Sequence, residues 1–206
     1  LPEAASQLQS SVFENHEKLW KERFSDISNM KGSENPYALH SELAEAMISN
    51  VLIVRENDKL QSTLDVIEDI ESRWKDIECV DTQDWSNPVP SFVNQLWNMI
   101  QLSKIITMGA LKRDEFRGSH YKPKFDLNQP DDFDPADYLE YEEQKANGGV
   151  HKDQFAPSHV DYMERFEKNN EDWLKSSIAT YNNGKPAVDF ESVDTSLIAP
   201  RPRKYD

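Results

Sequence analysis

The densest polar chemistry in the sequence lies in the stretch Glu115–Pro123, where Arg117, His120 and Tyr121 fall within five residues. An arginine can pair with a carboxylate or phosphate, and a histidine can exchange a proton near neutral pH. Two interpretations follow: contact with a cofactor or substrate, or docking onto another domain through hydrogen bonds and an ion pair. No paired carboxylates, serine–histidine pair or activated cysteine can be argued from spacing, so no catalytic residue is assigned.

A second polar pattern, His-x-Asp, occurs twice, as His151 with Asp153 and as His159 with Asp161. Histidine nitrogens and carboxylate oxygens can together bind a metal ion. A separation of eight residues across a proline is not a known ligand signature, however, and a solvated acidic segment explains the same residues. We therefore expect no metal site.

The Glu115–Pro123 stretch must be positioned by the apolar pattern that precedes it. Apolar residues recur three and four apart at Phe92, Leu96, Met99, Ile100, Ile106 and Ala110. This spacing predicts a long amphipathic helix over residues 91–123 with one buried face. Gly118, which can adopt a left-handed conformation, and Pro123 mark the predicted end of the helix. The polar residues are therefore expected at the end of a rigid helix.

Two similar patterns lie upstream. One predicts a helix over about 36–54, through Leu39, Leu43, Met47 and Val51, and the other a helix over 57–77, through Leu60, Leu64, Ile67, Ile70, Trp74 and Ile77. With the 91–123 helix they predict an all-α, three-helix up-down-up bundle that is spectrin-repeat-like. Val51–Val54 is interpreted as the buried end of the first of these helices, since nothing nearby offers a strand partner.

The rest of the chain frames this bundle. A further helix is predicted over 10–30. Residues 131–172 hold 13 Asp or Glu and 4 Lys or Arg, and so carry 9 of the 15 net negative charges. We expect two short surface helices there, around 135–145 and 157–170, and an extended tail from Trp173. The predicted domains are a linker and preceding helix (1–33), the bundle (34–125), an acidic insertion (126–170) and the extended C-terminal tail (171–206).

Composition excludes several classes of function. The formal net charge of −15 argues against nucleic acid as a partner, because phosphate binding needs a basic surface. The single cysteine, Cys79, excludes an internal disulfide. No apolar run approaches the roughly 20 residues needed to cross a bilayer. The six glycines form neither common phosphate-binding motif, so no cofactor-binding residue is assigned.

Several stretches carry a resemblance to a known family. They are Gln95–Met99, Ile105–Ala110, Arg117–Pro123, Glu34–Tyr37, Leu39–Leu43, Asn50–Leu60, Trp173–Lys175, Asp194–Ile198 and Pro200–Arg201. Through them the chain resembles the C-terminal helical region of the succinate dehydrogenase and fumarate reductase flavoprotein subunit, except over 126–170. Phe116 and Ser119 stand where that family usually has serine and alanine.

The resemblance implies that the parent subunit oxidises succinate to fumarate, transfers hydride to FAD and sends electrons through an iron–sulfur subunit to quinone. The implied partners are the flavin-binding domain of the same subunit, the iron–sulfur subunit and, indirectly, a membrane-anchor cytochrome b subunit at the cytoplasmic face of the bacterial inner membrane. This chain would pack on the flavin domain without binding FAD or doing the chemistry. The docking candidates are Glu115, Arg117, Gly118, His120 and Tyr121.

Two alternatives remain open. L-aspartate oxidase also carries an Arg-Gly-x-His stretch after a helical bundle, although Tyr121–Pro123 and the residues around Pro200 favour the succinate enzyme. A freestanding helical interaction domain would share the bundle but have no redox role. The succinate-enzyme interpretation requires a parent more than about twice this length, with a glycine-rich dinucleotide motif near its start.

Overall fold

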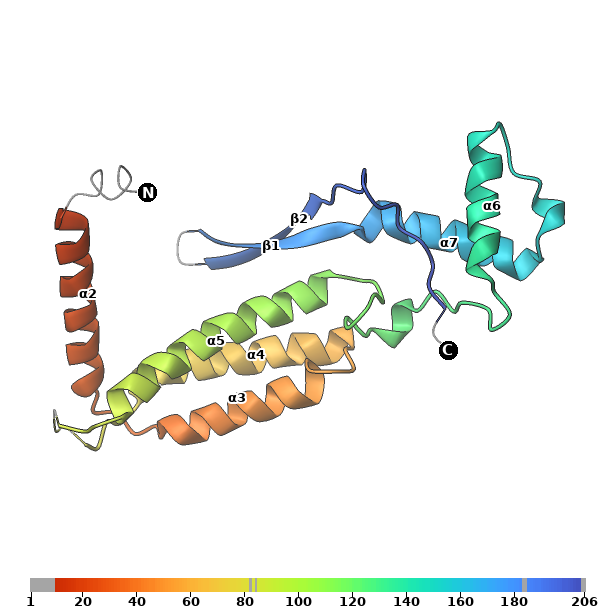
Figure 1. The fold of residues 1–206 in the computed structure, drawn as a ribbon. Helices are drawn as coiled ribbons and strands as arrows, with labels where there is room; N and C mark the ends of the chain where they lie inside the picture. Colours follow the sequence, from red (N-terminus) through yellow and green to blue (C-terminus); the bar gives the residue numbers. More distant parts are fainter. Residues whose placement is uncertain (1–9, 82, 84, 183–184, 205–206) are drawn as a thin grey trace. The chain divides into compact units, whose positions relative to one another are not determined.

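The computed structural model describes residues 10–81, 83, 85–182 and 185–204, which are mainly helical (Figure 1). Residues 1–9, the first part of the predicted linker, lie outside the described residues, and so does Gly184, one of the six glycines. The longer helices are α2 (Ser10–Ser28), α3 (Pro36–Asn50), α4 (Asn57–Arg73), α5 (Val89–Lys112), α6 (Pro135–Ala146) and α7 (Pro157–Trp173). Short 3-10 turns are η1 (Trp74–Asp76), η2 (Pro123–Phe125) and η3 (Lys152–Gln154), and the strands are β1 (Lys175–Asn182) and β2 (Lys185–Ser192).

The chain divides into two compact units. Unit 1 takes in the residues up to Ser49 together with Gln61–Ile106, and unit 2 takes in Asn50–Leu60 together with the residues from Thr107 onward. Helices α4 and α5 each contribute residues to both units. The predicted domain boundaries at 33, 125 and 170 follow sequence composition and helical pattern, whereas the two units are defined by contacts between residues, so the boundaries stay a prediction.

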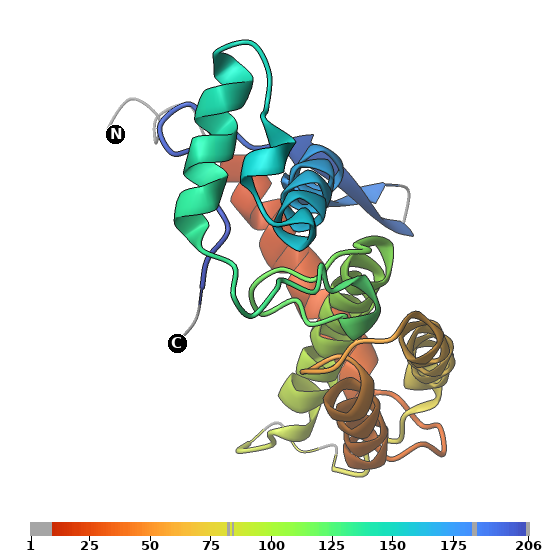
Figure 2. The same ribbon diagram turned by 90° about the vertical axis from the view of Figure 1, so that its right-hand side faces the viewer.

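Unit 1 is built on the predicted helical bundle. Helices α3, α4 and α5 run side by side and successive helices reverse direction (Figures 1 and 2). Their shared apolar core contains Ile27, Leu39, Leu43, Ile67, Ile70, Trp74, Ile77, Cys79, Val93, Leu96 and Ile100. The Trp74 indole N–H is satisfied inside this core by the Val93 carbonyl, at 3.0 Å. The prediction of an all-α bundle is confirmed.

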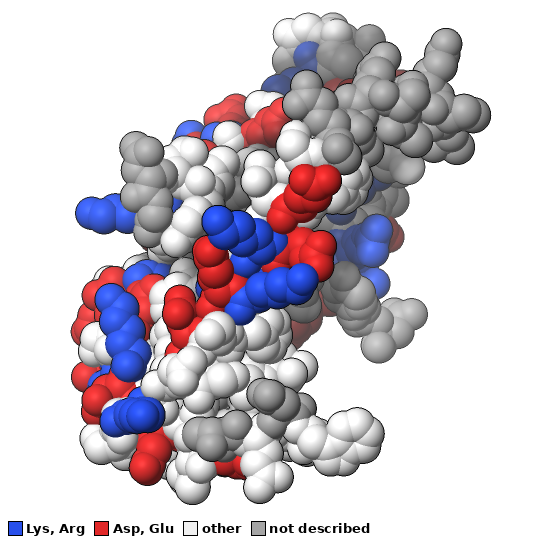
Figure 3. Space-filling model, turned by 90° about the vertical axis from the view of Figure 1, so that its left-hand side faces the viewer, with Lys and Arg blue, Asp and Glu red and all other residues white. Residues whose placement is uncertain are grey.

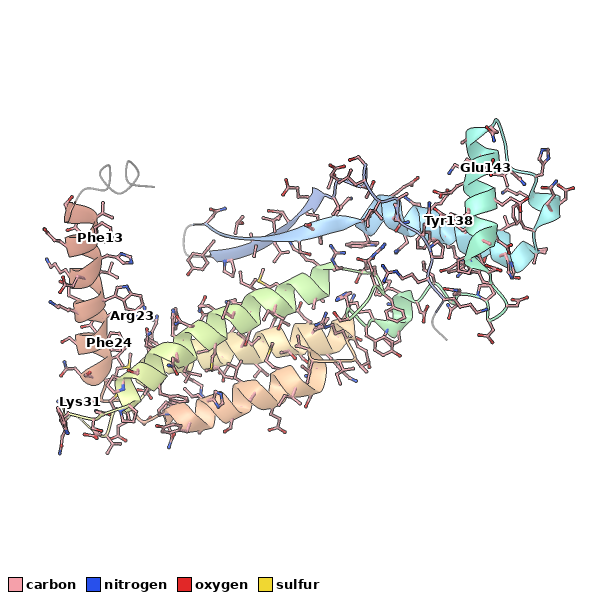
Figure 4. All side chains as sticks on the ribbon, in the orientation of Figure 1. Phe13, Arg23, Phe24, Lys31, Tyr138 and Glu143 are labelled. Atoms are coloured by element: carbon pink, nitrogen blue, oxygen red, sulfur yellow. The ribbon has the colours of Figure 1, made fainter. Side chains whose placement is uncertain are left out.

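Helix α2 matches the predicted helix over 10–30 but buries little of its apolar surface. Ile27 enters the bundle core, and the Arg23 side chain donates to Asn94 at 2.7 Å. Phe24 is half-buried, whereas Phe13, nearer the other end of the helix, is exposed (Figure 4). The C-terminal end of α2 is therefore the part that packs in unit 1.

The linker after α2 is held by backbone pairing with the segment that follows α4. The Ser33 and Glu34 amides both donate to the Asp76 carbonyl at 2.8 Å, and the Gly32 amide donates to Ile77 at 3.1 Å. A Cβ on Gly32 would lie only 1.9 Å from the Asp76 carbonyl oxygen. Glycine is required at position 32 because of this close backbone approach.

Unit 2 contains a second core, in the acidic segment. Buried residues of α6, α7 and the loop before α6 form it: Phe133, Tyr138, Tyr141, Val160, Tyr162, Met163 and Phe166. Helices α6 and α7 match the helices predicted around 135–145 and 157–170. They are predicted to lie on the surface, but aromatic packing such as Phe133 against Tyr162, with ring centroids 4.8 Å apart, gives them an interior of their own.

The predicted extended tail forms a hairpin. Strands β1 and β2 pair antiparallel, with Lys175 opposite Ser192 and Asn182 opposite Lys185. Val188 is the buried residue of β2. The alternation around Val188 indicated extended backbone, but the pairing of the two strands was not predicted.

Two predicted helix ends are wrong. Helix α3 stops at Asn50, and Val54 forms a parallel bridge with Tyr121 where no strand partner was expected. Helix α5 stops at Lys112, well before Gly118. Its apolar repeat ends at Ala110, so no core contact extends the helix further. Met99 and Ile106, expected on its buried face, are exposed. Within the described residues, no helix is long and apolar enough to cross a membrane.

We predict that Gly32→Ala lowers the free energy of unfolding by about 2–4 kcal/mol, because the new methyl group displaces the Asp76 carbonyl and its two hydrogen bonds. The matched control is Gly109→Ala in α5, where a Cβ meets nothing within 4 Å. It should raise stability by up to about 1 kcal/mol. Urea denaturation measures both, and equal effects would contradict the assignment of a close approach at Gly32.

Candidate functional site

The candidate site lies in a tight turn after α5. The backbones of Arg117 and His120 exchange both hydrogen bonds, with N···O distances of 3.2 and 3.0 Å. Gly118 and Ser119 make the turn between them, and Gly118 has a φ of +57°. Glycine enters this left-handed region without a steric penalty, which explains why it stands here. We call residues 115–121 the arginine–histidine turn.

Glu115 is the buried acid of this turn, with no solvent exposure. Its carboxylate accepts hydrogen bonds from Arg113 Nη1, from Arg117 Nε at 2.7 Å and from Asn169 Nδ2 at 3.4 Å. The Arg117 guanidinium also donates to Asn170 Oδ1 at 2.8 Å. One carboxylate therefore neutralises part of two guanidinium groups and connects the turn to α7.

Arg113 extends the same network to the hairpin. Its Nη1 donates to the Trp173 carbonyl at 3.1 Å and its Nη2 to the Lys175 carbonyl. Its guanidinium carbon lies 5.4 Å from the centre of the Phe190 ring, a cation–π contact. Glu115 thus fixes an arginine that in turn satisfies the backbone where α7 passes into β1.

His120 is held as a neutral ring by two partners. Its Nε2 lies 2.9 Å from the Arg113 carbonyl, which can only accept, so Nε2 carries the proton. Its Nδ1 then accepts from Arg55 Nη1, at 2.6 Å. Burial lowers the pKa of His120, the Arg113 carbonyl opposes this effect, and the Arg55 charge adds to it. A positioned, neutral histidine of this kind serves as a structural hydrogen-bond acceptor.

Lys122, the residue after the turn, is 1% exposed. Its ammonium donates to Asp114 Oδ1 at 2.9 Å and to the Leu111 carbonyl at 3.1 Å. Burial lowers the pKa of Lys122, and Asp114 partly offsets that effect. Asn57 Nδ2 also donates to Asp114, at 3.1 Å, and so joins the start of α4 to this pair.

The structure brings the five docking candidates together, but in different roles. Glu115 and Arg117 bond within unit 2, and Gly118 is exposed at the turn. Tyr121 is exposed and packs edge-on against Phe116, with ring centroids 5.0 Å apart. Three further residues of the site are not predicted from the sequence: Arg55, Arg113 and Lys122. Arg55 and Lys122 each follow a residue of the Val54–Tyr121 bridge, and predicting that bridge could have found them.

The two His-x-Asp pairs do not form a joint site. His151 is exposed, whereas His159 is buried between Asp137 and Asp132, with Nδ1 and Nε2 at 2.8 and 3.2 Å from their oxygens. Asp161 instead pairs with an arginine of its own helix. Over the ranges that the structure describes, no group of three or more His, Cys, Asp or Glu is placed to hold a metal ion.

The described glycines do not build a pyrophosphate-binding loop. Gly32 lies against the Asp76 backbone, Gly109 lies within α5, and Gly148 and Gly149 follow the end of α6 in open space. Lys and Arg also lie interspersed with Asp and Glu on the face shown in Figure 3. Among the described residues, these glycines do not come together in a phosphate-binding loop.

Comparison with known proteins places these features in context. The family described as "Fumarate reductase flavoprotein C-term" matches residues 40–205. The chain is 38% identical over 207 residues to the succinate dehydrogenase flavoprotein subunit of Bacillus subtilis, a match covering 100% of this chain and 28% of that protein. It is 29% identical over 135 residues to the 8-methylmenaquinol:fumarate reductase flavoprotein subunit of Wolinella succinogenes, covering 64% of this chain and 21% of that one.

A solved structure of an E. coli quinol fumarate reductase has the same fold. It superposes with a TM-score of 0.69 at 18% identity, over 97% of this chain and 28% of the other. The chain therefore spans less than a third of the length of these relatives.

We predict that Glu115→Gln lowers the free energy of unfolding of unit 2 by about 3–5 kcal/mol, because two partly buried guanidinium groups lose the buried carboxylate that they share. The matched control is Glu143→Gln on the exposed side of α6 (Figure 4), which should change stability by less than about 0.5 kcal/mol. Thermal denaturation followed by circular dichroism compares them. A neutral Glu115→Gln would show that the network does not stabilise the turn.

A pH dependence follows from His159. Burial disfavours its charged form, but Asp137 and Asp132 outweigh burial and raise the pKa of His159. The stabilisation is therefore fully present below the unfolded-state pKa of about 6.5 and is lost as pH rises through the folded-state pKa. We predict that the free energy of unfolding of wild type exceeds that of His159→Gln by less and less as pH rises through this folded-state pKa.

The difference between the two proteins is the quantity to measure, since the pKa of His120 is lowered and contributes the opposite slope in wild type and variant alike. Urea denaturation from about pH 5.5 to 8.5 covers the range. His151→Gln, at an exposed histidine, is the control and should leave the slope unchanged. A difference independent of pH would contradict the charged pairing of His159.

Proposed function

Because this chain belongs to the fumarate reductase and succinate dehydrogenase flavoprotein family, as the C-terminal region of the flavoprotein, we propose that its parent subunit oxidises succinate to fumarate. The observation that carries the proposal is the family match over residues 40–205, with 38% identity to a succinate dehydrogenase flavoprotein over the whole chain. FAD, when bound by the part of the parent outside this chain, would accept the two electrons. This chain supplies a helical domain.

The proposed role of the domain is docking. It packs on the flavin-binding domain of the same subunit and supports contacts with the iron–sulfur subunit, which passes electrons toward quinone. A membrane-anchor cytochrome b subunit is an indirect partner, and the subunit is peripheral at the cytoplasmic face of the bacterial inner membrane. The support for these partners is the family match and the two relatives, which are flavoprotein subunits of a succinate dehydrogenase and of an 8-methylmenaquinol:fumarate reductase.

Within this role the docking candidates divide into two groups. Glu115 and Arg117, whose side chains bond to each other, hold the shape of the arginine–histidine turn. Gly118 and Tyr121 are exposed on this turn and are proposed to contact the flavin domain. His120 holds the turn in place through its hydrogen bond to the Arg113 carbonyl. None of these residues is proposed to touch the reacting atoms.

We predict that the gene product expressed in its own host is a polypeptide at least about three times as long as this chain, since the chain covers 28% of its Bacillus subtilis relative. It should carry flavin and oxidise succinate. Intact mass spectrometry, flavin fluorescence and a succinate-dependent dye reduction assay test this. A flavin-free product of about 23.9 kDa would mean that the domain acts alone.

The isolated 206-residue chain should neither bind FAD nor oxidise succinate, because its described residues offer no dinucleotide-binding loop. Titration with FAD followed by fluorescence quenching tests binding, with the parent subunit as the positive control. A yellow, active preparation of the 206 residues would overturn this assignment.

A further inference from the structure

Arg55 is a half-buried cation whose partners are both neutral. Its Nε donates to the Val51 carbonyl at 2.8 Å and its Nη1 to His120 Nδ1 at 2.6 Å. No carboxylate pairs with it among the described residues. A guanidinium has five N–H donors, so three of them have no acceptor in the described part of the chain. Burying a charge without a counter-ion is costly, and burial accordingly lowers the pKa of Arg55.

Three other arginines of unit 2 each have a carboxylate partner among the described residues, unlike Arg55. Arg113 and Arg117 share the Glu115 carboxylate, and Arg165 pairs with Asp161 at 2.9 Å. The chain holds 38 acidic residues against 23 basic ones, so carboxylates are abundant. Within the described part of this strongly acidic chain, Arg55 is nevertheless left without a carboxylate partner.

The charge of Arg55 acts on two neighbouring side chains. Arg55 contributes to the lowered pKa of both His120 and Lys122, so its charge acts on both side chains. Asp114 is engaged by Lys122 and Glu115 by its two arginines. An anion would therefore find unused donors on Arg55, while Asp114 and Glu115 are already paired with other cations.

Exposed apolar side chains lie on the two segments that hold Arg55. Their exposed fractions are 62%, 66%, 43% and 37% for Leu52, Ile53, Val54 and Tyr121. The segments are paired through the Val54–Tyr121 bridge and through the Arg55 amide, which donates to the Tyr121 carbonyl at 3.0 Å. We call these four residues the apolar rim. An arginine beside exposed apolar and aromatic side chains is typical of a protein–protein interface. A small free anion would bind the arginine without contacting the apolar rim, so the rim favours a polypeptide partner.

We propose that Arg55 receives an Asp or Glu carboxylate from the part of the parent subunit outside these 206 residues, and that the apolar rim packs against the same segment. The inference rests on the proposed function, because the carboxylate comes from the rest of the parent polypeptide. This chain covers only 28% of its Bacillus subtilis relative, so most of such a parent lies outside these 206 residues. A carboxylate matches the planar donor pattern of arginine and supplies the missing charge.

The test uses Arg55→Lys in the full-length subunit, treated with a carbodiimide that joins an amine directly to a contacting carboxylate. We expect peptide mass spectrometry to find the introduced amine linked to an Asp or Glu outside residues 1–206. Lys59 and Glu56, whose charged groups are 2.9 Å apart and exposed, give the internal positive control. Links only within residues 1–206, to a second copy, or to another subunit would overturn the proposal, as would no link while the control pair reacts.

Once identified, that carboxylate is changed to its amide in a double-mutant cycle with Arg55→Met. Removing either partner of the buried pair should raise the unfolding constant of the subunit by about 30-fold or more, and the double variant should add little further. As the control, Lys168→Met removes exposed pairs with Asp172 and Glu171 and should change the constant by less than about fivefold. Additive effects would show that Arg55 and the carboxylate do not interact.

If Arg55→Lys fails to fold, the wild-type subunit still decides the question through hydroxyl-radical footprinting. We expect Leu52 and Tyr121 to be oxidised far more slowly than their 62% and 37% exposure here implies. Rates in line with those exposures would overturn the proposal. A subunit that carries flavin and oxidises succinate yet fails these tests retains the proposed function and loses only the Arg55 contact, whereas a flavin-free product defeats the proposed function first.

Discussion

The shared carboxylate of Glu115 is the interaction on which unit 2 depends. A buried acid between Arg113 and Arg117 is favourable only if the geometry of all three groups is kept, because each charge left alone in the interior is costly. Arg113, held by Glu115, donates to the Trp173 carbonyl, and Arg117 donates to the Asn170 side chain, so both segments depend on the same carboxylate. The end of α5, the end of α7 and the start of the hairpin are therefore fixed by one ionised group.

Helical periodicity predicted the elements whose contacts are local in sequence. The helices from Pro36, from Asn57, from Pro135 and from Pro157 each repeat apolar residues on one face, and each has a capping residue or a proline at its start. Those signals lie within one helix, so the sequence alone carries them. Chemistry of the same local kind also predicted the positive φ of Gly118, although in a tight turn and not at a helix end.

The missed features all depend on residues distant in sequence. Val54 was assigned to a helix because its partner, Tyr121, lies far along the chain, and the pairing of β1 with β2 was not predicted from a loose alternation. His159 read as a solvated residue because nothing in the sequence shows Asp132 and Asp137 closing on its ring. The identity of Glu115 as a buried acid was hidden in the same way, since an acidic residue is exposed by default.

The contact between Arg55 and His120, which are 65 positions apart, has a consequence for biosynthesis. A ribosome adds about 5–20 residues per second, so His120 is made roughly 3–13 s after Arg55. The segment Leu52–Val54 therefore emerges from the ribosome that much earlier than the Tyr121 segment to which Val54 is bridged. The nascent chain therefore passes through a period in which an apolar segment has an open backbone edge, and a chaperone that recognises such segments would find its target there.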